Sequence, residues 1–237
     1  MNLLLYTAND RTADKQVRIS DERLQHLRAV LDTKAGDTLR VGEIGGLMGK
    51  ATVLEISAEH ALLDIALSEP PPPKIPLRIV LALPRPKMLR RILRMVAELG
   101  VAELDLINSY RVEKSYWQTP VLDPPTIDAY FLQGLSQARD TVLPSLTLHR
   151  RFKPFVEDVL PGLLENRRGL LAHPGDHPPC PGRQQQPGLL VIGPEGGFIP
   201  YEVEKLEAAG CDVVSLGPRI LRVENAVSTL IARLSTD

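Results

Sequence analysis

Aromatic residues and net charge are both scarce in this sequence. Phe, Trp and Tyr make up 4% of the 237 residues, which argues against an RNA-binding sheet surface built from stacking aromatics, as in the RRM fold. The formal net charge is −1 at pH 7, so no overall positive charge attracts nucleic acid. Any contact with RNA must therefore come from local basic patches.

Cysteines and long apolar runs are scarce as well. Cys180 and Cys211 are the two cysteines and form no C-x-x-C pair, which is typical of a reducing compartment without structural disulfides. The apolar start at residues 1–6 is too short for a signal peptide. No apolar run approaches the roughly 18 residues of a membrane span. We therefore expect a cytoplasmic protein that is not in a membrane.

The most informative segment is 189–234. Two apolar runs in it, 189–192 and 213–216, are typical of buried parallel strands, and each leads into a glycine-proline loop. A helix is predicted between them at 200–210, with proline in its first turn and glycine at its end. A last helix is predicted from about Asn225. Open α/β sheets bind ligands where strands end in such loops, so this segment is the candidate site.

The two loops, GPEGG at 193–197 and GPR at 217–219, lack the signatures of phosphate-binding loops. Neither G-x-G-x-x-G leading into a helix nor Gly-Lys-Ser/Thr is present. Pro194 and Pro218 also lack the amide N–H groups that a phosphate site would use. The loops therefore favour an uncharged or zwitterionic ligand. The alternative is that both are ordinary turns between a strand and a helix.

The two loops together resemble a known family. The sequence IGPEGGF at 192–198, followed by a helix and then SLGPRILR at 215–222, resembles the signature of the RsmE family. These are bacterial methyltransferases of the SPOUT superfamily that make 3-methyluridine in 16S ribosomal RNA. The resemblance implies S-adenosylmethionine as methyl donor, ribosomal RNA or the small ribosomal subunit as partner, and a homodimer.

The resemblance also implies a fold. It implies an α/β protein with a C-terminal SPOUT-type domain that contains a trefoil knot, preceded by a small PUA-like β-barrel that binds RNA. A proline run, which cannot continue a helix or a central strand, marks the expected boundary. We therefore expect a PUA-like barrel over 1–70, a stiff linker over 71–76 and the SPOUT domain over 77–237.

The pattern of apolar residues predicts the secondary structure of both domains. The expected strands of the first domain are 3–6, 38–41, 50–56 and 61–67, with one helix that begins at Ser20-Asp21-Glu22 and runs to about residue 31. In the second domain the expected strands before the candidate site are 77–83, 101–107, 147–151 and 169–171, with helices at 87–99, 126–139 and 152–160.

Cofactor residues are carried over from the resemblance onto the ends of the predicted strands. They are Leu171, His173, Ile192, Gly193, Pro194, Glu195, Gly196, Gly197, Leu216, Gly217, Arg219, Ile220 and Leu221. His173 also belongs to an H-x3-H-x2-C pattern with His177 and Cys180. Three such ligands without a fourth are incomplete for a structural zinc site, so no metal is expected.

The reaction implied by the resemblance requires a proton to leave N3 of uracil while negative charge develops on the uracil oxygens. Arg222 is the candidate to stabilise that charge, with Arg219 next. Glu224 is a candidate proton acceptor, although a carboxylate of ordinary pKa is a weak base for this purpose. The alternative for Arg222 and Glu224 is a salt bridge at the start of the last helix.

The sequence departs from the family pattern beside these residues. The family commonly has Arg-Thr-Glu-Thr-Ala where this chain has RVENA at 222–226. Val223 and Asn225 thus replace two threonine hydroxyls, which leaves the substrate open. The alternatives are a SPOUT methyltransferase for another RNA nucleotide and a non-catalytic RNA-binding or ribosome-assembly protein.

Candidate RNA-binding residues lie in two helices and one loop. They are Arg23, His26 and Arg28 in the first helix, Lys87, Arg90, Arg91 and Arg94 in the helix at 87–99, and Arg111 in the loop after residue 107. Positive charge on a helix face is suited to phosphate contacts. Such faces are also commonly just solvated, and Arg111 could instead pack its loop against the body of the domain.

Overall fold

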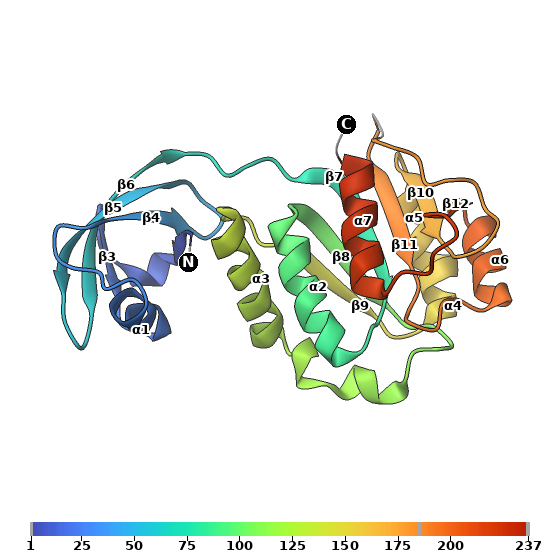
Figure 1. The fold of residues 1–237 in the computed structure, drawn as a ribbon, viewed down its shortest axis with the longest axis horizontal. Coiled ribbons are helices and arrows are strands. Elements are labelled where there is room, and N and C mark those ends of the chain that lie inside the picture. The colour runs from blue at the N-terminus through green and yellow to red at the C-terminus, as the bar shows by residue number, and fades with distance from the viewer. Residues whose placement is uncertain (1, 184–185, 236–237) are drawn as a thin grey trace. The chain divides into compact units, whose positions relative to one another are not determined.

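The computed structural model describes residues 2–183 and 186–235 and divides the chain into two compact units (Figure 1). Each unit is discontinuous in sequence. The first unit comprises Met1–Pro73 and Leu132–Leu143, and the second comprises Lys74–Phe131 and Pro144–Asp237.

The N-terminal unit is built on a six-stranded mixed sheet. Its strand order is β1-β4-β5-β6-β3-β2, in which β1 and β4 are parallel and the other neighbours are antiparallel. The strands are β1 Leu4–Tyr6, β2 Arg11–Ala13, β3 Gln16–Ile19, β4 Thr38–Glu43, β5 Met48–Ile56 and β6 Ala61–Glu69. A 3-10 helix, η1, spans Ala8–Asp10, and the helix α1 spans Glu22–Ala29.

Strands β2 and β3 were not predicted from the sequence. In β3, Val17 and Ile19 are fully buried and alternate with polar Gln16 and Arg18. Such an alternation is the signature of a half-buried strand, but it covers only four residues. The helix start was predicted correctly, because Asp21 is the N-cap of α1 and its side chain accepts a hydrogen bond from the Arg23 amide.

The segment 132–143 belongs to the N-terminal unit, whereas the sequence analysis expected it in the second domain. Hydrogen bonds attach it there. The Ser136 hydroxyl donates to the Leu3 carbonyl at 2.7 Å, and the Thr141 hydroxyl donates to the Gly46 carbonyl at 2.6 Å. These partners are 133 and 95 residues apart in the chain, so no local pattern could indicate the contact.

The second unit contains a six-stranded, fully parallel sheet in the order β12-β10-β11-β7-β8-β9. The strands are β7 Ile75–Ala82, β8 Val101–Ile107, β9 Ser145–His149, β10 Arg168–Ala172, β11 Gly188–Ile192 and β12 Cys211–Val214. The helices are α2 Pro86–Glu98, α4 Phe152–Pro154, a π-helix Phe155–Val159, α5 Leu160–Leu164, α6 Pro200–Ala208 and α7 Val223–Ser235, with 3-10 turns η2 Lys114–Gln118 and η3 Pro120–Leu122. Helix α3, Pro124–Ala138, is divided between the units, with its residues up to Phe131 in this one.

Several elements differ from their expected bounds for clear reasons. The expected linker overlaps the start of β7, because a register shift between Ile75 and Arg78 accommodates Pro76 in a central strand. The expected helix at 152–160 is divided into α4, a π-helix and α5 next to Pro154 and Pro161, which lack amide donors.

Strand order places the carboxyl ends of β10, β11 and β12 side by side. The first strand of the unit, β7, lies in the middle of the sheet, and the chain adds strands on both sides of it. Helices α2 and α7 lie next to each other on one face of the sheet (Figure 1). The strand order therefore reverses at β7. An open α/β sheet binds its ligand at the carboxyl ends of strands near such a reversal.

Candidate functional site

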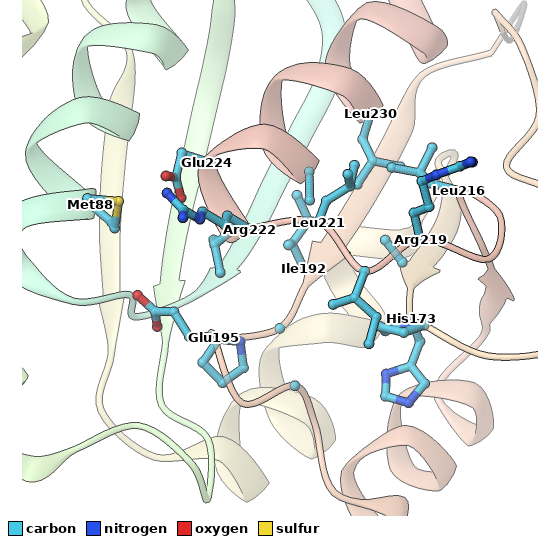
Figure 2. Close-up of a pocket in the computed structure, with 18 of the residues that line it drawn as sticks. Met88, His173, Ile192, Glu195, Leu216, Arg219, Leu221, Arg222, Glu224 and Leu230 are labelled. Atoms are coloured by element: carbon cyan, nitrogen blue, oxygen red, sulfur yellow. The ribbon is translucent and has the colours of Figure 1, made fainter.

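A cavity of about 770 Å³ lies at the carboxyl ends of these strands (Figure 2). Its wall comes from the segments that follow β10, β11 and β12, together with the first turns of α2 and α7. All but two of the predicted cofactor residues line it. Those lining residues are His173, Ile192, Gly193, Pro194, Glu195, Gly197, Leu216, Gly217, Arg219, Ile220 and Leu221.

The two exceptions, Leu171 and Gly196, lie elsewhere for identifiable reasons. Leu171 is fully buried within β10, before the strand reaches the cavity. Gly196 instead meets the side chain of Arg111, and a Cβ atom on this glycine would lie 2.9 Å from the Arg111 Cδ. The strand before the second loop also ends two residues early, at Val214, because Ser215 forms a bridge with Pro179.

Sequence reasoning missed a second group of cavity residues. They are Arg85, Met88, Ala172, Pro174, Val214, Ser215, Val223, Ala226 and Leu230. Most of them are neighbours in sequence of predicted residues, so extending each motif by one or two positions would have found them. Arg85 and Met88 required the fold, because only the sheet order brings the start of α2 next to the glycine loop.

The loop at 193–197 is a compact turn attached to α2. Its Gly197 amide donates to the Pro194 carbonyl at 2.8 Å, and Gly197 has φ +71°, a backbone conformation that favours glycine. Glu195 accepts a hydrogen bond from the Arg85 amide at 3.0 Å. Figure 2 shows the Glu195 side chain directed toward the start of α2. The loop thus positions one carboxylate at the cavity wall.

The connection between β10 and β11 closes the other side of the cavity. Within it, the Pro178 carbonyl accepts from the Ser215 amide and the Cys180 amide donates to the Ser215 carbonyl, both at 2.8 Å. The Arg233 guanidinium of α7 donates to the Cys180 carbonyl at 2.5 Å. This connection is therefore hydrogen-bonded to both the segment after β12 and the last helix.

His173 stands where this connection begins. Its ring is half-buried and lies 5.8 Å from the ring of His177. Burial, followed by the nearby His177 and Arg111, lowers the pKa of His173 below its usual value. Among the described residues, no group of three His, Cys, Asp or Glu side chains is placed to hold a metal ion. The neutral imidazole can accept or donate a hydrogen bond to a ligand in the cavity.

The candidate catalytic residues lie at the α2 end of the cavity. Figure 2 shows the Arg222 and Glu224 side chains on the side of Met88, whereas the Arg219 side chain points away from them. Neither Arg222 nor Glu224 forms an ion pair with another described residue, so the structure does not contain the alternative salt bridge. Helix α7 begins at Val223, two residues earlier than expected, which places Glu224 in its first turn.

The basic residues of α2 are divided between the cavity and the surface. Lys87 and Arg91 line the cavity, and Arg90 is exposed. Arg94 instead lies over the Tyr130 ring at 5.2 Å. All four residues were expected to form one RNA-binding face, and three of them, Lys87, Arg90 and Arg91, remain available for that purpose.

The basic residues of α1 have a different environment. Arg23 donates to Asp10 and Asp21, each at 2.7 Å, and to the Leu5 carbonyl at 2.9 Å. The guanidinium therefore connects α1 to the start of the N-terminal sheet, which favours a structural role over RNA binding. His26 is half-buried, with an Nε2 atom that has no hydrogen-bond partner among the described residues, and Arg28 is exposed.

Arg111 packs against the glycine loop. Its guanidinium donates to the Gly196 carbonyl. Next to it, the Tyr110 amide donates to a carboxylate oxygen of Glu202 at 2.7 Å, while the Ile199 amide donates to the other oxygen at 3.1 Å. The structure thus supports the packing alternative for Arg111, and it places this residue beside the glycine loop at 193–197.

Within the described part of the chain, no helix has the length and apolarity needed to cross a membrane.

Comparison with known proteins agrees with the fold. The chain is 28% identical over 222 residues to ribosomal RNA small subunit methyltransferase E of Treponema pallidum, which covers 90% of this chain and 82% of that protein. It is 22% identical over 236 residues to ribosomal RNA small subunit methyltransferase E 1 of Borreliella burgdorferi, covering 100% of this chain and 97% of the relative.

A solved structure supports the same fold. Ribosomal RNA small subunit methyltransferase E from Neisseria gonorrhoeae, bound to S-adenosylmethionine, superimposes with a TM-score of 0.75 over 97% of this chain and 95% of its own, at 17% identity. At that identity the likeness concerns the fold. The RNA methyltransferase domain, as a family, matches residues 71–235. That match covers more than half of the chain and includes every strand of the parallel sheet and the residues that line the cavity, so the chain belongs to the RNA methyltransferase domain family.

Proposed function

We propose that this protein transfers a methyl group from S-adenosylmethionine to N3 of a uridine in 16S ribosomal RNA. The observation that carries the proposal is the cavity itself. Two glycine loops, which follow the parallel strands β11 and β12, line it together with Arg222, Glu224, Lys87 and Arg91. This places a region suited to a small ligand next to charged groups that can meet RNA.

The residues of the cavity fit S-adenosylmethionine. A volume of about 770 Å³ lies within the usual range for small-molecule sites. Apolar side chains such as Ile192, Leu216 and Leu230 can cover an adenine ring, while the Glu195 and Glu224 carboxylates offer partners for positive charge. The prolines at 194 and 218 leave few amides for a polyphosphate. When bound, this cofactor supplies an electrophilic methyl group on a sulfonium.

The residues at the α2 end have distinct roles in the proposal. Arg222, without an ion pair among the described residues, is available to stabilise negative charge on the uracil oxygens. Lys87 and Arg91 bind phosphates of the RNA and orient the nucleotide. Glu224 is the candidate acceptor of the N3 proton. N3 is hidden in paired RNA, so the target nucleotide enters unpaired or flipped out.

We also propose the finer features of the fold and assembly. The hydrogen bonds of the 173–187 connection to Ser215 and Arg233 support a trefoil knot, since the segment after β12 runs beside that connection before α7 begins. The mixed six-stranded sheet of the N-terminal unit supports a PUA-like RNA-binding domain. Ile220 and Leu221, which are 82% and 38% exposed beside the cavity, support a homodimer. Action on ribosomal RNA during ribosome assembly implies that the protein is located in the cytoplasm.

The test is methyl transfer from labelled S-adenosylmethionine to small ribosomal subunits that lack the modification, followed by digestion and mass spectrometry. We expect labelled 3-methyluridine. A different labelled nucleoside would contradict N3 of uridine and identify a methyltransferase with another target, in which case Val223, which lines the cavity, is the first residue to examine. Failure to bind the cofactor, measured by calorimetry, would instead indicate a non-catalytic RNA-binding protein.

A further inference from the structure

Two tyrosines are unusually exposed in the second unit. Tyr110, in the loop after β8, is 79% exposed, and Tyr201, in the first turn of α6, is 46% exposed. The chain has only 4% aromatic residues. Single exposed aromatic side chains are common on protein surfaces, so exposure alone assigns no role to them. The way in which the rest of the structure holds their backbones does indicate a role.

Both tyrosines are held next to one buried carboxylate. Glu202 is only 2% exposed and accepts hydrogen bonds from the amides of Tyr110 and Ile199, at 2.7 and 3.1 Å. Tyr201 precedes Glu202 in α6. A buried carboxylate is costly unless it is hydrogen-bonded, and this one joins two separate loops. It keeps the backbone of both tyrosines in place while their rings face solvent.

The same carboxylate attaches the tyrosines to the cofactor loop. Arg111, directly after Tyr110, donates to the Gly196 carbonyl, and Ile199 lies two residues after Gly197. The neighbouring residues Arg111 and Lys114 are basic, and the Lys205 ammonium lies 5.8 Å from the centre of the Tyr201 ring. The acidic residue Glu113, which lies between Arg111 and Lys114 in the sequence, accepts a hydrogen bond from the Tyr116 hydroxyl at 2.9 Å.

We propose that Tyr110 and Tyr201 stack on unpaired nucleobases of the RNA next to the methylated nucleotide. Aromatic rings held on a rigid backbone with cations beside them are how proteins bind single-stranded nucleic acid, because every base has a face that can stack. The inference rests on the proposed function for the identity of the RNA. It assigns a binding role to the loop at 108–113 beyond the packing of Arg111 on the glycine loop.

Binding of a fluorescent oligouridylate to the full chain tests the proposal without requiring catalysis. Replacing a stacking residue by alanine weakens such binding by roughly tenfold per stacked base. We therefore expect Tyr110→Ala and Tyr201→Ala to raise the Kd about tenfold each, and Tyr110→Phe to bind like the wild type because the ring remains. In Tyr110→Trp, the added indole should be quenched when the oligonucleotide binds.

Matched controls separate stacking from damage to the fold. Leu99→Ala removes an apolar side chain that is 37% exposed after α2, at the other end of β8 from Tyr110, and should leave RNA binding unchanged. All variants should bind S-adenosylmethionine as the wild type does. Methylation of ribosomal RNA by Tyr110→Ala should show a raised KM with an unchanged kcat.

Each outcome decides the matter. Oligonucleotide binding that is unaffected by both alanine variants, or absent from the wild type, overturns the proposal. A loss of binding to assembled subunits without a loss of binding to naked RNA also overturns it, because the tyrosines would then contact a ribosomal protein. If the wild type methylates no RNA while the tyrosine-dependent binding is observed, the proposed function fails, whereas the stacking of Tyr110 and Tyr201 on unpaired bases holds.

Discussion

Helices α1 and α2 carry similar clusters of basic residues, yet the structure uses them differently. In α1, Arg23 is hydrogen-bonded to two carboxylates and a carbonyl of its own unit. In α2, Lys87 and Arg91 line the cavity and form no ion pair with another described residue. The difference shows that a basic helix face indicates a binding surface only where no acid of the same fold lies beside it.

The same distinction holds within the second unit. Arg78 in β7 is a further basic residue near α2 in the sequence, but its guanidinium donates to Asp105 and Glu103, each at 2.6 Å. Asp105 is fully buried and also lies 2.8 Å from the His149 Nε2. Cations that are paired inside the fold should matter for stability, and those at the cavity should matter for function. The following predictions test that division.

The largest effect is expected at Arg222. Arg222→Ala should lower kcat for methyl transfer by a factor of roughly 10² to 10³, because a group that stabilises developing negative charge is lost. The melting temperature and the affinity for S-adenosylmethionine should change little, since Arg222 has no ion pair among the described residues. Arg222→Lys, which keeps the charge, should retain part of the activity. If Arg222→Ala destabilised the protein as much as we predict below for Arg23→Met, the division between stabilising and functional cations would be wrong.

Arg23→Met should lower the free energy of unfolding of the N-terminal unit by roughly 2 kcal/mol. Removing one member of a buried ion pair costs more, but the Asp21 side chain is 51% exposed and Asp10 is 16% exposed, so solvent reduces the loss. Hydrogen exchange of β1 and α1 amides would measure it locally. Arg28→Met, at an exposed position on the same helix, is the matched control and should have almost no effect.

The Arg23 contribution should also depend on pH. Burial raises the pKa of Asp10, but hydrogen bonds from Arg23 and Thr7 outweigh this effect and hold that pKa below its usual 3.8. Hydrogen bonds from Arg23 likewise lower the pKa of Asp21. Between the lowered pKa of each carboxyl in the folded state and its ordinary pKa in the unfolded state, the unfolded chain binds more protons than the folded one. The free energy of unfolding therefore falls as the pH falls through that window.

The wild type and Arg23→Met should therefore differ by a constant amount from pH 7 to pH 5. Their unfolding curves should converge below about pH 4, where the carboxylates become protonated. Denaturant titrations at several pH values would measure the difference. A difference that persists unchanged at pH 2 would mean that Arg23 acts through packing and not through its charge.

The smallest effects are expected at the cavity cations of α2. Lys87→Ala and Arg91→Ala should each weaken RNA binding a few-fold and reduce the slope of log K against log salt by about 0.7, the value for one lost contact to single-stranded RNA. Arg167→Ala is the control, because Arg167 is paired with Glu103 at 3.1 Å. If the salt slope were unchanged in the α2 variants, Lys87 and Arg91 would not contact RNA phosphates.

Much of the second unit followed from local patterns. Strand β8 was predicted with its observed bounds, and α2 and β11 within one residue, because apolar runs and flanking glycine or proline define such elements. The two glycine loops that line the cavity were located by their motif. Strands β2 and β3 of the N-terminal unit were missed, since they are three and four residues long and mostly polar.

The sequence by itself determined the parallel α/β architecture, the glycine loops at the strand ends and the residues that line most of the cavity. Each of these depends on residues close together in the chain. Only the tertiary structure decided which charges are free. It paired Arg23 with Asp10, Arg78 with Asp105 and the Tyr110 amide with Glu202, and it returned residues 132–143 to the first unit. These contacts join residues 13 to more than 90 positions apart, and charge pairing depends on distance in space, which a linear pattern does not contain.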